Sequence, residues 1–539
     1  MAILDGGFLI YPAALAAGFW LLRRYVKERE FQSFAAQHGC RPLPHSGSWV
    51  PFALDRMWTA LRVVDARGDV MEELFFPSFR AMGWTFSSAG AFGETNIMTA
   101  DPANMRAVLA TQFHDFSTGA SRMGSFGYLL GKCLFTVDGE EWERSRAMFR
   151  PHFARGEIND MDIEKTAADE LVYAIKTYME EGEAWTGEVN LQTLFLRLTL
   201  DSGTEFFFGA NVKSQLGAIP GARVNVDPDL AEIGKMVVAG QAGEGELSFG
   251  EAFHTASAQV RARGNAGDYA FLFRSSKADR AVKYLQTFMD FLIARAHAKG
   301  RGKTSTGKHT WLETLSRDIP DPEELRNQSL FLFTAARDTT AGTLSFLFLL
   351  LAKHKSAFQK LRAAVLADFG TKDEPKEIAF YNLKKCQYLQ WCLYETLRLF
   401  PPGPINLRVA ERDTVLPTGG GPDGKSPIAV RKGQKVLLGF YVMQRRSDIW
   451  GEDAAEFRPE RWEGRQADGT FLSFSGGPRI CLGSELHPTP FSMTTSLASF
   501  LLFEFCRISC SLLANGYFLY RRVCPCGGCI GDRADASGI

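Results

Sequence analysis

The segment at 474–483, FSGGPRICLG, holds one cysteine between an arginine and a glycine. The glycine pair and proline that open it favour a sharp, stiff turn. Arg479 can neutralise a charge beside a thiolate at Cys481, and Gly483 lets another group approach the backbone closely. One cysteine cannot hold zinc, but a thiolate is a soft ligand that can serve as the axial ligand of a heme iron. A lone cysteine is also common as a small buried apolar residue, so the segment alone leaves both interpretations open.

A second group of reactive side chains lies in an apolar stretch. The segment TAARDTTAG at 334–342 places Asp338 and Thr339 within the run 323–353, whose second half is almost wholly apolar. A carboxylate and a hydroxyl in an apolar helix need hydrogen-bond partners or a functional role such as proton transfer. A satisfied core pair or a helix kink is the simpler alternative. The run is long enough for a central buried helix or a membrane span, and the charges of Arg337 and Asp338 favour the buried helix.

Two further pairs have helical spacing. The segment WCLYETLRLFPP places Glu395 and Arg398 three residues apart, before two prolines that end the helix. The segment at 129–153 places Trp142 and Arg146 four residues apart. Taken alone, the first pair is more simply a common surface ion pair, and a tryptophan packed on the core explains the second equally well.

The elements that must position these residues are mostly helices. Helical periodicity is clear at 160–181, 191–208 and 279–298. Glycines and prolines punctuate short β-like runs between 415 and 440. The sequence therefore predicts a mainly α fold with a smaller β-rich part.

Composition excludes some classes of function. The chain has 539 residues, enough for a large core, with 61 basic and 61 acidic side chains. This balance argues against a nucleic-acid-binding surface over the whole molecule, so no nucleic-acid partner is expected. The 43 phenylalanines fit a phenylalanine-rich core or an apolar substrate chamber.

The N-terminus has the pattern of a membrane anchor. The run 6–22 is uncharged, and its 17 residues would span roughly 25 Å as a helix. Because Asp5 precedes the run and Arg23 and Arg24 follow it, an anchor with a cytoplasmic C-terminal side is favoured over a cleaved signal peptide. A buried helix kinked at Pro12 is the other alternative. Residues 25–64, which include three prolines, are expected to form a linker and docking segment.

Together these features resemble the cytochrome P450 family. Phe474, Gly477, Arg479, Cys481 and Gly483 match F-x-x-G-x-R-x-C-x-G, the heme-binding loop of that family. The resemblance implies the cytochrome P450 fold, with heme b as cofactor. It also implies that Cys481 is the axial thiolate and that Arg479 is a partner of a heme propionate.

The resemblance extends to the other motifs. It implies that Thr339 hydrogen-bonds iron-bound dioxygen and that Asp338 helps to relay protons, although Ala336 stands where the family usually has glycine. Trp142 and Arg146 match a family helix that contacts a heme propionate. The remaining implied assignments are a structural triad on the proximal side, Glu395, Arg398 and Arg461, and a further propionate partner, Arg408.

Two segments, 134–155 and 406–433, are similar to the fungal microsomal n-alkane and fatty-acid hydroxylases. This similarity implies hydroxylation of a long-chain apolar substrate at its terminal carbon, with O2 and with electrons from an NADPH-dependent flavoprotein reductase. The implied location is the endoplasmic reticulum membrane, with one N-terminal anchor and a cytoplasmic catalytic domain. Isomerase or peroxygenase chemistry is a third alternative, which the intact Asp338–Thr339 pair disfavours.

The resemblance ends after Gly483. Pro488 and Pro490 fall where the family has a helix beneath the heme, and each costs roughly 3 kcal/mol in a helix interior. Residues 484–539 are therefore expected to be an atypical tail from unspliced or shifted coding sequence, and the alternative function is an inactive or unstable heme-binding membrane protein. The expected organisation is an anchor at 1–24, a linker at 25–64, a monooxygenase domain at 65–483 and this tail.

Overall fold

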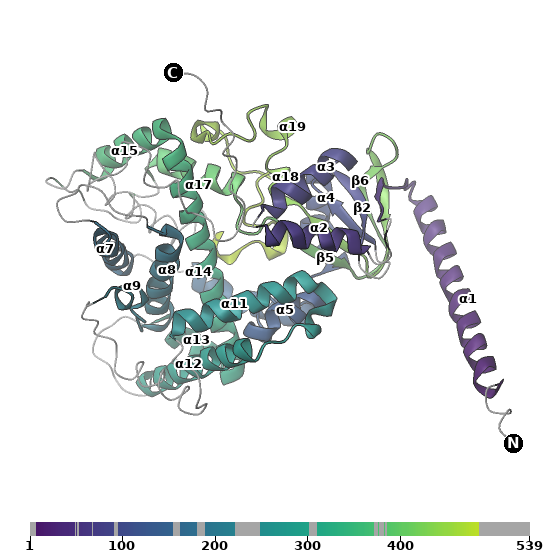
Figure 1. Cartoon of the computed structure of the whole chain (residues 1–539), viewed down its shortest axis with the longest axis horizontal. Coiled ribbons are helices and arrows are strands. Elements are labelled where there is room, and N and C mark those ends of the chain that lie inside the picture. The colour runs from purple at the N-terminus through teal and green to yellow at the C-terminus, as the bar shows by residue number, and fades with distance from the viewer. Residues whose placement is uncertain are drawn as a thin grey trace. The chain divides into compact units, whose positions relative to one another are not determined.

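The computed structural model describes residues 7–48, 50, 53–66, 68–90, 95–154, 162–179, 189–220, 248–300, 310–370, 374, 376, 382 and 385–484. The chain forms two compact units (Figure 1). The sheet unit comprises Met1–Ser117, Ile405–Met443 and Gly476–Arg479. The helical unit comprises Thr118–Pro404, Gln444–Ser475 and Ile480–Ile539. All of the expected tail except Ser484 lies outside the described residues.

The sheet unit contains the β-rich part. A six-stranded sheet has the order β1 (His45–Ser46), β2 (Thr85–Ala89), β3 (Thr95–Thr99), β8 (Lys435–Leu438), β5 (Asn406–Ala410) and β4 (Phe116–Ser117). A separate antiparallel pair joins β6 (Thr414–Gly420) to β7 (Ser426–Val430). The strands predicted between 415 and 440 are therefore confirmed.

Short helices accompany the sheet. They are α2 (Leu54–Asp65), η2 (Met71–Phe75), α3 (Phe76–Met82), α4 (Pro102–Arg106), η4 (Ala107–Thr111), η5 (Phe113–Asp115), α18 (Phe440–Met443) and η9 (Gly477–Arg479). Side-chain oxygens cap some of them. The carboxylate of Asp101, for example, accepts the backbone N–H groups of Ala103 and Asn104, which begins α4.

The longest helix of the sheet unit is α1 (Gly7–Gln37). It continues through residues 25–37, where a linker is expected from the sequence, because no proline or glycine interrupts that stretch. It ends where Gly39 adopts a left-handed φ of +64° and the Cys40 N–H donates to the Ala35 carbonyl. Among the described residues, no helix, α1 included, is both long and apolar enough to cross a membrane.

The helical unit holds the larger part of the core. Its helices are α5 (Ala120–Leu130), α6 (Gly139–Ala154), α7 (Asp162–Lys176), α8 (Leu191–Phe208), α9 (Ser214–Gly217), α11 (Phe249–Ala266), η7 (Gly267–Leu272), α12 (Ser276–Gly300), α13 (Trp311–Asp318), α14 (Pro322–Lys353), α15 (Lys355–Phe369), α17 (Gln387–Leu399), α19 (Ser447–Trp450), η8 (Pro459–Trp462) and η10 (Leu482–Ser484). The predicted helices at 160–181, 191–208 and 279–298 correspond to α7, α8 and α12.

Helix α14 is the central element of the helical unit. Asp321 caps its first turn by accepting the backbone N–H groups of Glu323 and Glu324. Figure 1 shows α8, α12 and α17 packed around it. Leu344 and Leu347 are fully buried in the core cluster, and burying each leucine side chain stabilises the fold by about 1.5–3 kcal/mol. The prediction of a buried helix for the run 323–353 is therefore confirmed.

Candidate active site

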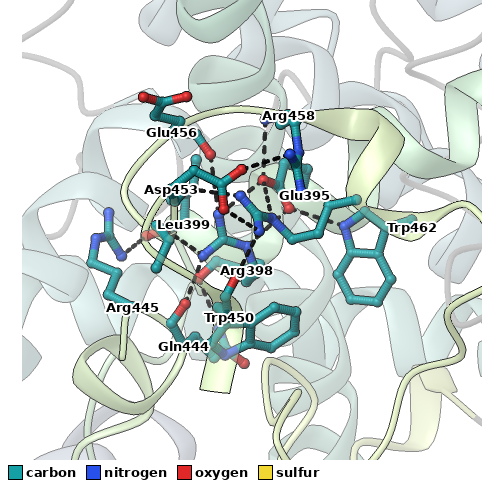
Figure 2. A network of polar contacts seen from close by, with 12 residues as sticks. Glu395, Arg398, Leu399, Gln444, Arg445, Trp450, Asp453, Glu456, Arg458 and Trp462 are labelled. Atoms are coloured by element: carbon teal, nitrogen blue, oxygen red, sulfur yellow. Dashed lines mark hydrogen bonds and ion pairs between the residues drawn. The ribbon is translucent and has the colours of Figure 1, made fainter. Parts of the chain in front are cut away.

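Glu395 lies at the centre of a buried polar network (Figure 2). It is on α17, and its side chain is fully buried. Its two carboxylate oxygens accept hydrogen bonds from Nε and Nη2 of Arg398, both at 2.8 Å. Nε of Arg461 donates to Oε1 at 3.2 Å, and Nε1 of Trp462 donates to Oε2 at 3.0 Å. The carboxylate is thus held by two cations and an indole in a low-dielectric interior.

The two arginines tie this carboxylate to distant segments. Arg398 donates from Nη1 to the Gln444 and Ala454 carbonyls, at 2.7 and 2.6 Å. Arg461 donates from Nη1 to the Trp450 carbonyl at 2.6 Å and to the Asp453 carboxylate at 2.8 Å. The hydrogen bond from Arg461 lowers the pKa of the Asp453 carboxyl. The structure therefore brings the three residues of the expected triad together and joins α17 to the chain before the cysteine segment.

The cysteine segment is closed by its own backbone. The Cys481 N–H donates to the Phe474 carbonyl at 2.9 Å, and the N–H and hydroxyl of Ser484 donate to the Cys481 carbonyl at 3.0 and 2.6 Å. The Phe474 ring packs against Phe471, a member of the core cluster. The Cys481 side chain itself is exposed. The fold thus fixes the backbone at Cys481 while the residue stays exposed.

Gly477 occupies a position that no other residue fits. It has a φ of +68°, and a Cβ atom there would lie 1.8 Å from the Leu109 carbonyl oxygen on η4. Both the conformation and the close backbone approach require glycine. A β-carbon on Gly483, by contrast, would lie 3.7 Å from the Cys481 sulfur, an ordinary contact.

Gly477→Ala is expected to destabilise the protein and to lower its heme content. The left-handed conformation alone costs an alanine about 1–2 kcal/mol, and the contact with the Leu109 carbonyl adds to this cost. Denaturant unfolding and heme absorbance per mole of protein measure the two effects. Gly469→Ala is the matched control, since the structure shows no heavy atom within 4 Å of the added carbon. A Gly477→Ala protein with normal stability and full heme content would contradict the expected loop geometry.

Helix α6 reaches the segment from another part of the helical unit. Nη1 of Arg146 donates to the Ile480 carbonyl at 2.8 Å, directly before Cys481. Trp142 lies one turn earlier on α6 and is buried. These contacts place an arginine and an indole N–H donor on the helix that holds the cysteine segment. A heme, with an iron that takes a thiolate and propionates that take cationic donors, fits this set of groups.

The other expected heme partners belong to the sheet unit. Arg408 on β5 is buried, and its Nη1 donates to the Asn406 side chain at 2.7 Å and to the Leu407 carbonyl at 2.9 Å. Arg479 is the last residue of η9 and is half-buried. The expected heme-contacting residues are therefore divided between the two units.

The expected oxygen-activation pair lies in the middle of α14. The Thr339 side chain is exposed, and its hydroxyl donates to the Ala335 carbonyl at 2.7 Å. Because this bond uses the hydroxyl proton, the Thr339 oxygen can accept a hydrogen bond from another donor. Asp338 is 2.6 Å from Nη1 of Arg337. Ala336 lies in the same uninterrupted helix.

Three features of these networks are not predicted from the sequence. Gln444 accepts the Leu472 N–H at 2.7 Å and donates to two carbonyls at the end of α17. Trp462 directly follows Arg461 of the expected triad, but the resemblance assigns it no role. The sequence identifies Arg337 only as a charge, whereas the structure shows its contacts with Asp338 on α14 and Phe253 on α11. Gln444 has no sequence signal, since its partners are close only in the folded chain.

Comparisons with known proteins agree with this arrangement. The family model of cytochrome P450 matches residues 57–489. The chain is 36% identical over 486 residues to cytochrome P450 monooxygenase g430 of Fusarium sp, covering 89% of this chain and 82% of that protein. It is 35% identical over 483 residues to cytochrome P450 52A13 of Debaryomyces hansenii, covering 88% and 87% of the two chains. It is 41% identical over 399 residues to cytochrome P450 52A3-A of Candida maltosa, covering 72% of each.

A match over most of the chain defines the fold and the cofactor class. The mainly helical body with a smaller sheet part is the fold of the matched family, whose cofactor is a heme with a thiolate ligand. The chain belongs to the cytochrome P450 family and is a monooxygenase.

Proposed function

We propose that this monooxygenase hydroxylates a long-chain apolar substrate, an n-alkane or a fatty acid, at its terminal carbon. The overall reaction consumes R–H, O2, NADPH and H⁺ and yields R–OH, H2O and NADP⁺. The choice of substrate rests on the similarity of 134–155 and 406–433 to the alkane and fatty-acid hydroxylases. Heme chemistry at this site is supported by Cys481, which is exposed and whose N–H donates to the Phe474 carbonyl. Arg146 holds the preceding residue by donating to the Ile480 carbonyl.

The proposed roles follow from the chemistry of each side chain. Heme, when bound, supplies the iron at which O2 is reduced. Cys481 is the proposed iron ligand, and Phe474, Gly477 and Gly483 shape its loop. The proposed partners of the propionates are Arg479, Trp142, Arg146 and Arg408, and the proposed structural triad is Glu395, Arg398 and Arg461.

Asp338 and Thr339 are the proposed proton-delivery residues. Reduction of one oxygen atom to water consumes two protons. The buried apolar side chains of α14 cannot carry protons, whereas the Asp338 side chain is 41% exposed and Thr339 is exposed. A partly exposed carboxylate can exchange protons with solvent, and the hydroxyl of the next residue can hold an acceptor. Asp338 takes up and releases the proton, and the Thr339 hydroxyl orients the group that accepts this proton.

Asp338→Asn and Thr339→Ala are expected to uncouple the enzyme. NADPH consumption continues, while product formed per NADPH falls at least roughly tenfold, because a positioned proton donor contributes about 10²–10⁴-fold. Thr334→Ala is the control, since its hydroxyl makes the same bond to a carbonyl four residues earlier, at 2.7 Å. Product and NADPH are measured together in microsomes with a flavoprotein reductase. A normal ratio in both variants would rule out the proposed pair.

The substrate proposal is tested by turnover of the full chain with that reductase and NADPH. Long-chain n-alkanes and fatty acids are supplied separately, and products are identified by mass spectrometry. Terminal alcohols are the expected products. Oxidation at internal positions only, or turnover with peroxide and not with NADPH, would contradict the proposal.

We further propose that residues 1–24 anchor the protein in the endoplasmic reticulum membrane, with 25–64 as docking segment and 65–483 as a cytoplasmic catalytic domain. Phe19, Trp20 and Tyr25 on α1 are exposed, and the Arg24 guanidinium lies 5.4 Å from the Trp20 ring centroid. Aromatic and basic side chains of this kind favour the membrane interface. Alkaline washing of microsomes should release a chain lacking residues 1–24 and should retain the full chain. Release of both forms would contradict the anchor.

A further inference from the structure

Arg337 is a buried cation that lies over an aromatic ring. It lies on α14, and its side chain is only 8% exposed. Its guanidinium carbon lies 4.6 Å from the centroid of the Phe253 ring on α11. Phe253 is itself fully buried and packs edge-on against Phe333, with ring centroids 5.3 Å apart. The guanidinium is therefore stacked on a ring that its neighbours hold in place.

The polar contact of Arg337 is with the next residue along the chain. Its Nη1 donates to Oδ1 of Asp338 at 2.6 Å, and its Nε has no hydrogen-bond partner among the described residues. Burial lowers the pKa of the Arg337 guanidinium, and the Asp338 carboxylate opposes that shift. The cation thus depends on one carboxylate and one aromatic face.

Helix geometry alone does not produce this pair. Adjacent residues of an α-helix point about 100° apart and do not face each other. The Arg337 side chain must therefore be held toward Asp338, and the Phe253 ring is the described aromatic contact of its guanidinium. The Asp338 side chain is 41% exposed, so the buried cation holds a carboxylate that remains accessible.

We propose that Arg337 is a positioning residue for Asp338 and that Phe253 fixes Arg337 in the orientation this requires. The inference rests on the proposed proton-delivery role of Asp338. It links the packing of α11 to proton delivery on α14. A side-chain change on α11 then alters the coupling of NADPH to product without touching Asp338.

Four single variants test this inference in the full chain with reductase and NADPH. Arg337→Lys keeps the charge but loses the planar group that stacks on Phe253. Phe253→Leu removes the ring and keeps an apolar side chain. Phe208→Leu is the matched control, because Phe208 also packs against Phe333, with centroids 5.7 Å apart, and has no described ring contact with Phe253 or Arg337. Asp338→Asn gives the reference for full uncoupling.

Arg337→Lys and Phe253→Leu are expected to lower product per NADPH several-fold, toward the Asp338→Asn value, while Phe208→Leu keeps the wild-type ratio. Normal ratios in the first two variants beside a low ratio in Asp338→Asn would overturn the inference. A normal ratio in Asp338→Asn would instead overturn the proposed role of Asp338.

Thermal unfolding provides a readout that does not depend on activity. The midpoint shifts of Arg337→Met and Asp338→Asn should not add up in the double variant, because either change alone breaks the same ion pair. Arg337→Gln, which also removes the charge, takes the place of Arg337→Met if the latter does not fold. Additive shifts would show that the pair does not form in solution and would overturn the inference.

Discussion

Glu395→Ala is expected to destabilise the helical unit strongly. Glu395 is fully buried and accepts two hydrogen bonds from Arg398, which is also fully buried. Removing the carboxylate leaves the Arg398 charge uncompensated, and breaking a buried pair in this way costs about 3–5 kcal/mol. Since native proteins are stable by only about 5–15 kcal/mol, this is a large part of the total. Denaturant unfolding followed by circular dichroism measures the effect.

Two further variants distinguish the buried charge from ion pairs in general. Glu395→Gln keeps a hydrogen-bond acceptor and loses the charge, so its stability should lie between wild type and Glu395→Ala. Lys132→Gln breaks an exposed ion pair with Glu141, in which the side chains are 71% and 57% exposed, and should cost at most about 1 kcal/mol. A Glu395→Ala protein as stable as Lys132→Gln would show that the network in Figure 2 contributes little.

Cys481→Ser is expected to abolish monooxygenase activity. A neutral alcohol does not donate the electron density with which a thiolate favours O–O cleavage. Product formation should fall to the level of microsomes without the protein. Cys40→Ser is the control, because Cys40 is a free cysteine that is not among the candidate heme contacts.

The fold should survive the Cys481→Ser change. The hydrogen bonds that close the segment use the backbone N–H and carbonyl of Cys481, and its side chain is exposed. The thermal midpoint of the heme-free protein should therefore match wild type. A Cys481→Ser variant that still hydroxylates substrate with NADPH would contradict the proposed ligand.

The long helices were predictable because their apolar residues recur at helical spacing. Helix α8 has the predicted bounds, 191–208, and α14 begins one residue before the predicted run. The strands β1 and β4 were not predictable, since each has two residues and so no period to detect. Helix α1 extends further than expected because the prolines that argue against a helix begin only at Pro42.

The candidate site was predictable where its residues lie close together in sequence. The spacing of Glu395 and Arg398 placed them on one helical face, where the structure pairs them. The carbonyls that Arg398 reaches lie 46 and 56 residues further along the chain. Local sequence patterns carry no information on contacts at such separations. The stacking of Arg337 on Phe253 likewise depends on how α11 packs against the rest of the helical unit.

The absorption spectrum of the reduced, carbon-monoxide-bound full chain in microsomes tests the central claim most directly. Thiolate ligation of the iron by Cys481 predicts a Soret band at the position typical of a thiolate-bound heme, and the Cys481→Ser variant should lose that band. A band at the position of a neutral ligand, or no heme at all in the wild-type chain, would contradict the assignment of Cys481 as the iron ligand.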